Sequence, residues 1–189
     1  MTARTAAACL FLGIACFFLG IAVASGKAAP QKALPRIDDP AVLALEMAKA
    51  LVAADRERVT ALSATREEME LLLGTHQPPS TPEQRRELKE RVAEIVAERG
   101  PDFDRFQAMK KAADFKQGAA VRFELVDLDK IYEKDGMKKI RHSHVRMFQS
   151  TGGGTEQSFI IKLDDMFLFP RGWAFTSIWP AIGKEPATK

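Results

Sequence analysis

Cysteine is scarce in this chain, and its placement excludes two kinds of site. The only two cysteines, Cys9 and Cys16, both lie in the apolar segment that opens the sequence. The chain that follows this segment can therefore form no disulfide and no thiolate metal site. A metal ion bound there would need histidine and carboxylate ligands, and a cysteine nucleophile is excluded.

The chain also lacks an excess of charge of one sign. Its 28 basic residues stand against 25 acidic ones, which gives a formal net charge of +3. This balance does not indicate a nucleic-acid partner. Phosphate-binding, dinucleotide-binding and nucleophile-elbow motifs are absent as well, so we interpret the glycines at 152–154 as a flexible connection and expect no cofactor.

The first 25 residues are predicted to be a signal peptide or an N-terminal anchor. One charge, at Arg4, precedes an unbroken run of apolar and small residues from Ala6 to Ala24. An A-x-A cleavage site at Ala22 and Ala24 is typical of a secretory signal peptide. At about 19 residues, the run is also long enough to span a bilayer uncleaved. In either case we expect an extracytoplasmic chain, periplasmic or secreted, that contacts a membrane only if this run remains.

Residues 26–38 have the composition of a linker, and four segments with helical periodicity follow it. The first is predicted to begin at Asp38 or Asp39 before Pro40, and the second spans 60–73 with a capping box at Thr65 and Glu68. The third runs from Pro82 to a stop at 99–101, and Asp102 is predicted to cap the fourth. Helices of these lengths are not stable alone, so they should pack on a sheet.

Apolar and polar residues alternate with a period of two from 119 to 180, which predicts an antiparallel meander. The alternation slips near Val126, which indicates a bulge, and 134–136 has the composition of a tight hairpin turn. Asp164-Asp165 is interpreted as a strand-end bulge or turn. We therefore predict an α+β fold, with N-terminal helices packed on a curved four-stranded antiparallel sheet. The domain should span 39–183 and leave 184–189 as a loose tail.

Three short stretches resemble a known superfamily. They read Ala-Leu-Val-Ala-Ala-Asp at 50–55, Val-Thr-Ala-Leu at 59–62 and Thr-Arg-Glu-Glu-Met at 65–69, and a Gly-Trp pair at 172–173 opens the last predicted strand. Together they resemble small exported domains of the nuclear-transport-factor-2-like, cystatin-like superfamily, particularly its lumazine-binding-like members. The resemblance implies a cone-shaped α+β barrel with a ligand pocket, in a superfamily that contains both enzymes and non-catalytic members.

The expected function is that of a non-enzymatic binding or interaction domain with a small apolar ligand. Its pocket would be lined by some of the inward-facing apolar residues of the sheet, namely Phe123, Leu125, Phe159, Ile161, Trp173 and Phe175. A second possibility is a homodimer formed through the exposed face of the sheet. That face would then carry the apolar residues Ile140, Phe148, Ile160 and Ile178.

His142 and His144 are the most specific chemical candidates, because residues two apart on a strand share a face. An enzyme of the same fold, hydrolase-like or isomerase-like, could use them with Asp164 if all three converge in a pocket. The two imidazoles could also share a metal ion with Glu124, Asp127 or Asp164. The simpler interpretation is a solvated polar face, so we assign no metal.

Overall fold

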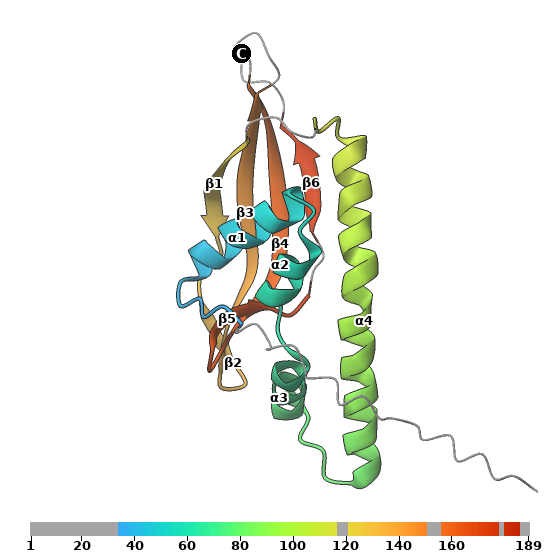
Figure 1. The fold of residues 1–189 in the computed structure, drawn as a ribbon. Coiled ribbons are helices and arrows are strands. Elements are labelled where there is room, and N and C mark those ends of the chain that lie inside the picture. The colour runs from blue at the N-terminus through green and yellow to red at the C-terminus, as the bar shows by residue number, and fades with distance from the viewer. Residues whose placement is uncertain (1–33, 117–120, 151–155, 178–179, 186–189) are drawn as a thin grey trace, which may run out of the picture. The chain divides into compact units, whose positions relative to one another are not determined.

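The computed structural model describes residues 34–116, 121–150, 156–177 and 180–185, which form four helices and one antiparallel sheet (Figure 1). The helices are α1 (Pro40–Val52), α2 (Arg56–Leu62), α3 (Arg66–His76) and α4 (Pro82–Ala112). The strands are β1 (Val121–Leu128), β2 (Tyr132–Lys134), β3 (Met137–Ser150), β4 (Glu156–Phe169), β5 (Gly172–Phe175) and β6 (Ala181–Lys184). The predicted α+β class is confirmed. The predicted signal peptide or anchor lies outside the described residues.

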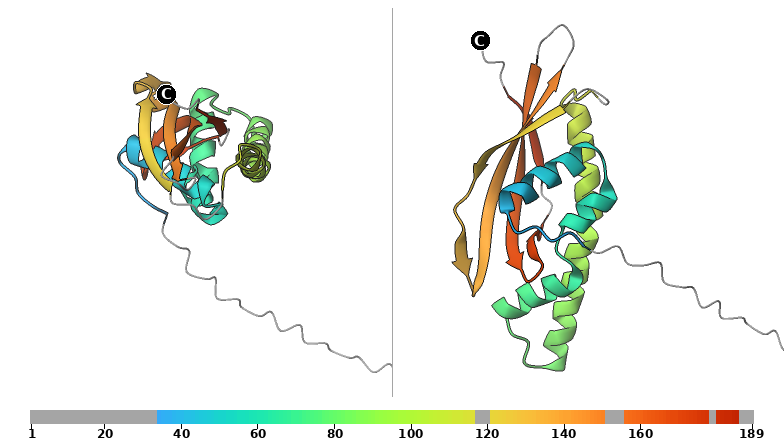
Figure 2. Two further views of the ribbon diagram at one scale, coloured as in Figure 1. Left: turned by 90° about the horizontal axis from the view of Figure 1, so that it is seen from above. Right: turned by 60° about the vertical axis from the view of Figure 1, so that its left-hand side comes forward.

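Helix α1 begins where the sequence predicted. The Asp39 carboxylate accepts a hydrogen bond from the Ala41 backbone N–H at 2.8 Å, and Pro40 occupies the first turn, where no N–H is needed. The helix lies across β1, β3, β4 and β5 and covers one face of the sheet (Figure 2). The residues that it buries there are Leu43, Ala44, Met47, Ala48, Ala50, Leu51 and Val52.

The second predicted helix is in fact two helices, α2 and α3, which meet at residues 63–65. The capping box is confirmed, because the Thr65 hydroxyl accepts from the Glu68 N–H at 3.2 Å and the Glu68 carboxylate accepts from the Thr65 N–H at 2.7 Å. An N-cap residue has a non-helical backbone. A helix cannot run continuously through 60–73 if Thr65 is an N-cap, so the two parts of that prediction were incompatible.

The predicted helix stop at 99–101 is wrong, because α4 runs for 31 residues through Pro101. Proline gives up the hydrogen bond to the Ala97 carbonyl, and its ring restricts the preceding residue. That residue is Gly100, whose missing Cβ leaves the helical conformation open. Apolar contacts hold the helix on both sides of the proline, since Val92 and Phe103 are both buried.

Side chains of α4 donate hydrogen bonds to backbone carbonyls at the C-terminal end of α1. Gln107 Nε2 donates to the Leu51 carbonyl and Lys110 Nζ donates to the Val52 carbonyl, both at 2.8 Å. These carbonyls belong to the last turn of α1, where the usual helical donors are missing, although the Leu51 carbonyl also accepts the Ala54 N–H at 3.2 Å. Burial lowers the pKa of Lys110. The two bonds attach the C-terminal half of α4 to the helix that covers the sheet.

Six strands form the sheet, rather than the predicted four, but the sheet is only four strands wide. The order is β1-β3-β4-β5, with β2 on the far part of β3 and β6 on the far part of β4. Each edge of the sheet is thus formed by two separate strands, β1 and β2 on one side and β5 and β6 on the other. The last predicted strand was expected to continue from the Gly-Trp pair to Pro180, but β5 ends at Phe175 and a separate strand, β6, pairs with β4 from Ala181. Two residues of the predicted loose tail are held by the sheet, because Lys184 belongs to β6 and the Glu185 N–H donates to the Ser158 carbonyl at 3.0 Å. The rest of that tail lies outside the described residues.

Both irregularities predicted in the first half of the sheet are confirmed. The register between β1 and β3 shifts between Leu125 and Asp127, so that Val126 is the extra residue of a bulge. The turn between β2 and β3 has positive φ at Asp135 (52°) and at Gly136 (74°). Two successive positive φ values are the signature of a type I′ hairpin turn.

The bulge or turn predicted at 164–165 proves to be an irregularity in the middle of β4, where Asp165 has a φ of 48°. Residues three apart on a regular strand point to opposite faces. Leu163 and Met166 nevertheless both lie in the main core, and Ser143 and Ile140 of the paired strand are both fully buried. The alternation of inward and outward side chains therefore changes phase on both central strands, β3 and β4, at the same place along the ladder. This change divides the sheet into two halves.

Helices cover the two halves differently. In the half that contains β2 and β5, Met166 belongs to the main core under α1, while Phe167 belongs to a second core with α3 and the N-terminal part of α4. Neighbouring strand residues point to opposite faces. We call this half closed, because helices cover both of its faces. The half that contains β1 and β6 has the main core on one face only, and we call its other face the open face.

The chain passes from one face to the other around the edge of β5. Ala64 N–H donates to the Phe175 carbonyl and Trp173 N–H donates to the Ile37 carbonyl, both at 2.7 Å. Isolated parallel bridges join Ile37 to Gly172 and Ser63 to Phe175. These contacts close an edge that would otherwise present unpaired backbone groups. No helix within the described ranges is long and apolar enough to cross a membrane.

Candidate functional site

The six residues predicted to line a pocket lie in the main core or against it. Phe159, Ile161, Trp173 and Phe175 are each at most 3% exposed, and Phe123 and Leu125 pack against them from β1. These side chains fill the space between the sheet and the helices. They are the right residues for the inward face, but the structure packs them as core.

The residues predicted to form a dimer face do not share one surface. Ile140 is fully buried in the main core because of the change of phase at Asp165. Phe148 and Ile160 are partly exposed on the open face, and Ile178 lies outside the described residues. On this face the guanidinium of Arg122 covers the Phe148 ring, 3.7 Å from its centroid.

Of the two histidine candidates, His142 lies beside Asp164 on the open face of the sheet, whereas His144 lies on the same face with its Nδ1 near Asp127 instead. Val145 and Met147 of β3 are fully buried, and His142 and His144, in the alternate positions, are 40% and 34% exposed at their side chains. His142 is the direct partner of Asp164 across the β3–β4 ladder. A catalytic arrangement inside the cone would need these side chains to point inward. Their outward placement removes that argument for an enzyme.

His142 is held between two carboxylates. Its Nδ1 lies 3.0 Å from Asp129 Oδ2, and that same oxygen accepts the His142 backbone N–H at 3.1 Å. Its Nε2 lies 3.6 Å from Asp164 Oδ1. The ring orientation is therefore fixed by Asp129, a residue that the sequence interpretation did not single out.

The remaining charges of the open face are also paired. Asp164 Oδ1 lies 3.4 Å from Lys162 Nζ, and His144 Nδ1 lies 3.9 Å from Asp127 Oδ2. Arg146 donates two hydrogen bonds to the Glu185 carboxylate, at 2.8 and 3.1 Å. Hydrogen bonding from Arg146 lowers the pKa of Glu185.

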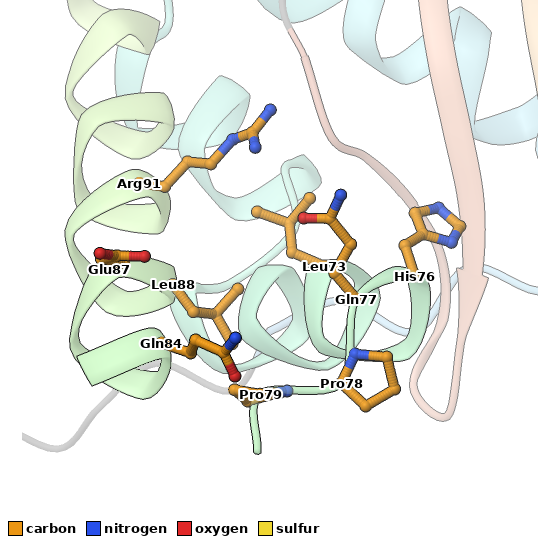
Figure 3. Close-up of a pocket in the computed structure, with 9 residues that line it drawn as sticks. All are labelled: Leu73, His76, Gln77, Pro78, Pro79, Gln84, Glu87, Leu88 and Arg91. Atoms are coloured by element: carbon orange, nitrogen blue, oxygen red, sulfur yellow. The ribbon is translucent and has the colours of Figure 1, made fainter. Parts of the chain in front are cut away.

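A groove of about 510 Å³ lies at the other end of the domain, between α3 and the first turns of α4 (Figure 3). Leu73 and Leu88 lie between the two helices, and Arg91 extends from α4 toward Leu73 and Gln77 (Figure 3). The lining consists of Leu73, His76, Gln77, Pro78, Pro79, Gln84, Glu87, Leu88 and Arg91. Four of these nine residues are apolar and five are polar or charged, so the groove offers an apolar floor together with polar groups, as ligand sites do.

His76 fixes one end of this groove. Its side chain is 22% exposed, and its Nδ1 contacts the carboxylate of Asp135 in the turn between β2 and β3. The contact joins the C-terminal turn of α3 to the tip of the hairpin. The groove was missed from the sequence because the connection between the helices predicted at 60–73 and from Pro82 was expected to be only a loop. The available signal was a pair of prolines between two leucine-bearing helices.

Comparisons with known proteins found no match for this chain. No protein-family model matches it, and no significant match was found among curated proteins or solved structures.

Proposed function

We propose that this chain is an exported, non-enzymatic binding domain that holds a small amphipathic ligand in the groove between α3 and α4. The ligand has an apolar body and one anionic group. The observation that carries the proposal is the groove itself, whose volume of about 510 Å³ lies within the usual range for small-molecule sites. Export is inferred from the N-terminal sequence pattern.

The apolar body would contact the floor of the groove. Leu73 and Leu88 come from facing helices, and Pro78 and Pro79 line the groove from the connection between these helices. The proline pair restricts the backbone of this connection, so little conformational entropy is lost there when a ligand binds. A preformed apolar floor favours a ligand that removes water from it.

The anionic group would pair with Arg91. Its guanidinium reaches over the groove, and Arg91 makes no ion pair with the residues that the structure describes (Figure 3). Arg86, one turn earlier, pairs instead with Glu90 outside the groove. The amide of Gln77 adds hydrogen-bonding groups to the rim, whereas the Gln84 amide oxygen already accepts from Ser80 and Thr81 at the start of α4.

Membership of the nuclear-transport-factor-2-like superfamily remains a proposal. A bent antiparallel sheet preceded by helices supports it, as does the Gly172-Trp173 pair at the start of β5. The ligand position differs from the one that the resemblance implies, because the inward-facing residues of the sheet are packed as core.

Fluorescence titration with 8-anilinonaphthalene-1-sulfonate tests the proposal, because this dye combines an apolar body with a sulfonate. We expect saturable binding to the folded chain and about fivefold weaker binding to Arg91→Gln, which corresponds to about 1 kcal/mol for one partly exposed charge. Leu73→Trp, which fills the groove, should abolish binding. The matched control Arg86→Gln should bind like the unmodified chain. Equal weakening in both arginine variants, or no effect of Leu73→Trp, would refute the groove as the site.

A further inference from the structure

We propose that His142, His144 and Asp164 form a binding site for a divalent transition-metal ion such as Zn²⁺ on the open face of the sheet. The site is independent of the groove between α3 and α4. Imidazole and carboxylate groups are the ligands that remain available for such an ion in a domain without cysteine.

The distance between two of the ligand atoms fits a bound ion. His142 Nε2 and Asp164 Oδ1 are 3.6 Å apart, which is too long for a hydrogen bond. Zinc lies about 2.1 Å from such nitrogen and oxygen ligands, and two bonds of this length span 3.6 Å when they meet at about 120°. Asp164 Oδ1 is itself buried, and among the described residues it makes no hydrogen bond of good geometry, although Lys162 Nζ approaches it to 3.4 Å. An ion between the two atoms would satisfy it.

Asp129 supplies the outer support that metal-binding histidines usually have. Its Oδ2 lies 3.0 Å from His142 Nδ1 and so leaves Nε2 directed toward Asp164. A carboxylate on the second ring nitrogen fixes the tautomer and the orientation of a ligating imidazole. Asp129 is therefore a positioning residue and not a ligand.

His144 provides the third ligand from the same face. It lies two residues along β3, about 7 Å from His142 along the strand. Its side chain is 34% exposed, and its nearest carboxylate, Asp127, is 3.9 Å away. Side chains of a strand lean along its direction. The His144 ring can therefore turn toward His142 without breaking a hydrogen bond of normal length.

Two features of the present side-chain arrangement have to change before an ion binds. As they stand, no three His, Cys, Asp or Glu side chains among the described residues surround a common point. The ammonium group of Lys162 also lies 3.4 Å from Asp164 Oδ1. Metal binding thus requires the His144 ring to turn and Lys162 to move into solvent, where its side chain is already 41% exposed.

Isothermal titration with Zn²⁺ at neutral pH tests the proposal. We expect one ion per chain, and at least tenfold weaker binding to His142→Ala, His144→Ala and Asp164→Asn. Asp129→Asn should weaken binding about tenfold, the usual effect of losing an outer carboxylate. Lys162→Gln should instead strengthen binding severalfold, because it removes the cation that competes for Asp164. A purely structural role for these residues does not predict this opposite sign.

The remaining histidine of the chain supplies the matched control. His76→Ala should bind zinc like the unmodified chain, because His76 lies on α3 and pairs with Asp135. In NMR spectra, the ring signals of His142 and His144 should shift together as zinc is added, while those of His76 stay in place. No heat above background from the unmodified chain would overturn the proposal. Binding that is lost in His76→Ala and kept in His142→Ala would do the same.

Discussion

Gly172→Ala should be among the most destabilising single substitutions in this domain. Gly172 has a φ of 114°, a backbone conformation that residues with a Cβ rarely adopt. A Cβ at this position would lie 2.4 Å from the Ile37 carbonyl oxygen and 2.9 Å from two other backbone atoms of that residue. Backbone atoms cannot yield as a flexible side chain can. The segment around Ile37 would have to move away from β5.

The size of the effect follows from two contributions. The strained φ costs about 1–3 kcal/mol for a residue with a side chain. Displacing Ile37 breaks its 2.7 Å hydrogen bond with the Trp173 N–H and leaves buried groups unpaired, which costs about another 1–3 kcal/mol. We therefore expect a loss of about 4 kcal/mol, a large part of the 5–15 kcal/mol that stabilises a typical domain.

Urea denaturation followed by circular dichroism measures this loss, and two other glycines serve as controls. Gly136 also has a positive φ, of 74°, but an added Cβ would meet nothing within 4 Å, so Gly136→Ala should cost only about 1 kcal/mol. Gly183 has neither feature, and Gly183→Ala should be nearly neutral. If Gly172→Ala and Gly136→Ala cost the same within 1 kcal/mol, the contact with Ile37 does not limit this position.

Two further predictions concern polar groups of the sheet. Gln149 is fully buried, and its amide accepts from the Lys116 N–H at 3.0 Å and donates to the Lys116 carbonyl at 2.6 Å. Gln149→Leu should cost about 2 kcal/mol in urea denaturation, whereas Gln157→Leu should be neutral or stabilising, because the buried Gln157 Nε2 has no hydrogen-bond partner among the described residues. The hydrogen bonds from Arg146 hold the pKa of Glu185 below its usual 4.5, so they stabilise the fold above that pH and lose this effect as the pH falls through the lower folded-state value. The urea midpoint of Glu185→Gln should therefore lie below that of the unmodified chain at pH 7 and converge with it in acid; a difference that persists at pH 2 would contradict the ion pair.

The helix caps and the sheet irregularities were predictable because local chemistry decides them. Asp39, Thr65 and the Val126 bulge each follow from one or two neighbouring residues. The continuity of α4 through Pro101 was not predictable in this way. A proline preceded by glycine is compatible with either a stop or a continued helix. Burial of Val92 in one core and Phe103 in the other decides between them, and both cores are assembled by tertiary contacts.

The partner of His142 could have been predicted from the hairpin turn. A two-residue turn at 135–136 pairs Lys134 with Met137, and counting back five residues on each strand places Asp129 opposite His142. The position of Asp164 opposite His142 depends on the register of the long β3–β4 ladder, and the sequence alone did not determine that register. The groove at α3 was not predictable for a different reason, since it exists only once residues 63–65 have carried the chain around the edge of β5.

This crossing separates the two proposed sites. Because α3 packs on Phe167 and Phe169, the groove belongs to the closed half of the sheet. His142 and Asp164 lie beyond the irregularity at Asp165, on the open face. The two sites have no residue in common, so a substitution in one site should affect binding at the other only through global stability. Leu73→Trp should leave zinc binding unchanged and Asp164→Asn should leave dye binding unchanged. Loss of both activities in either variant would indicate a folding defect rather than a site, and each proposal can therefore fail alone.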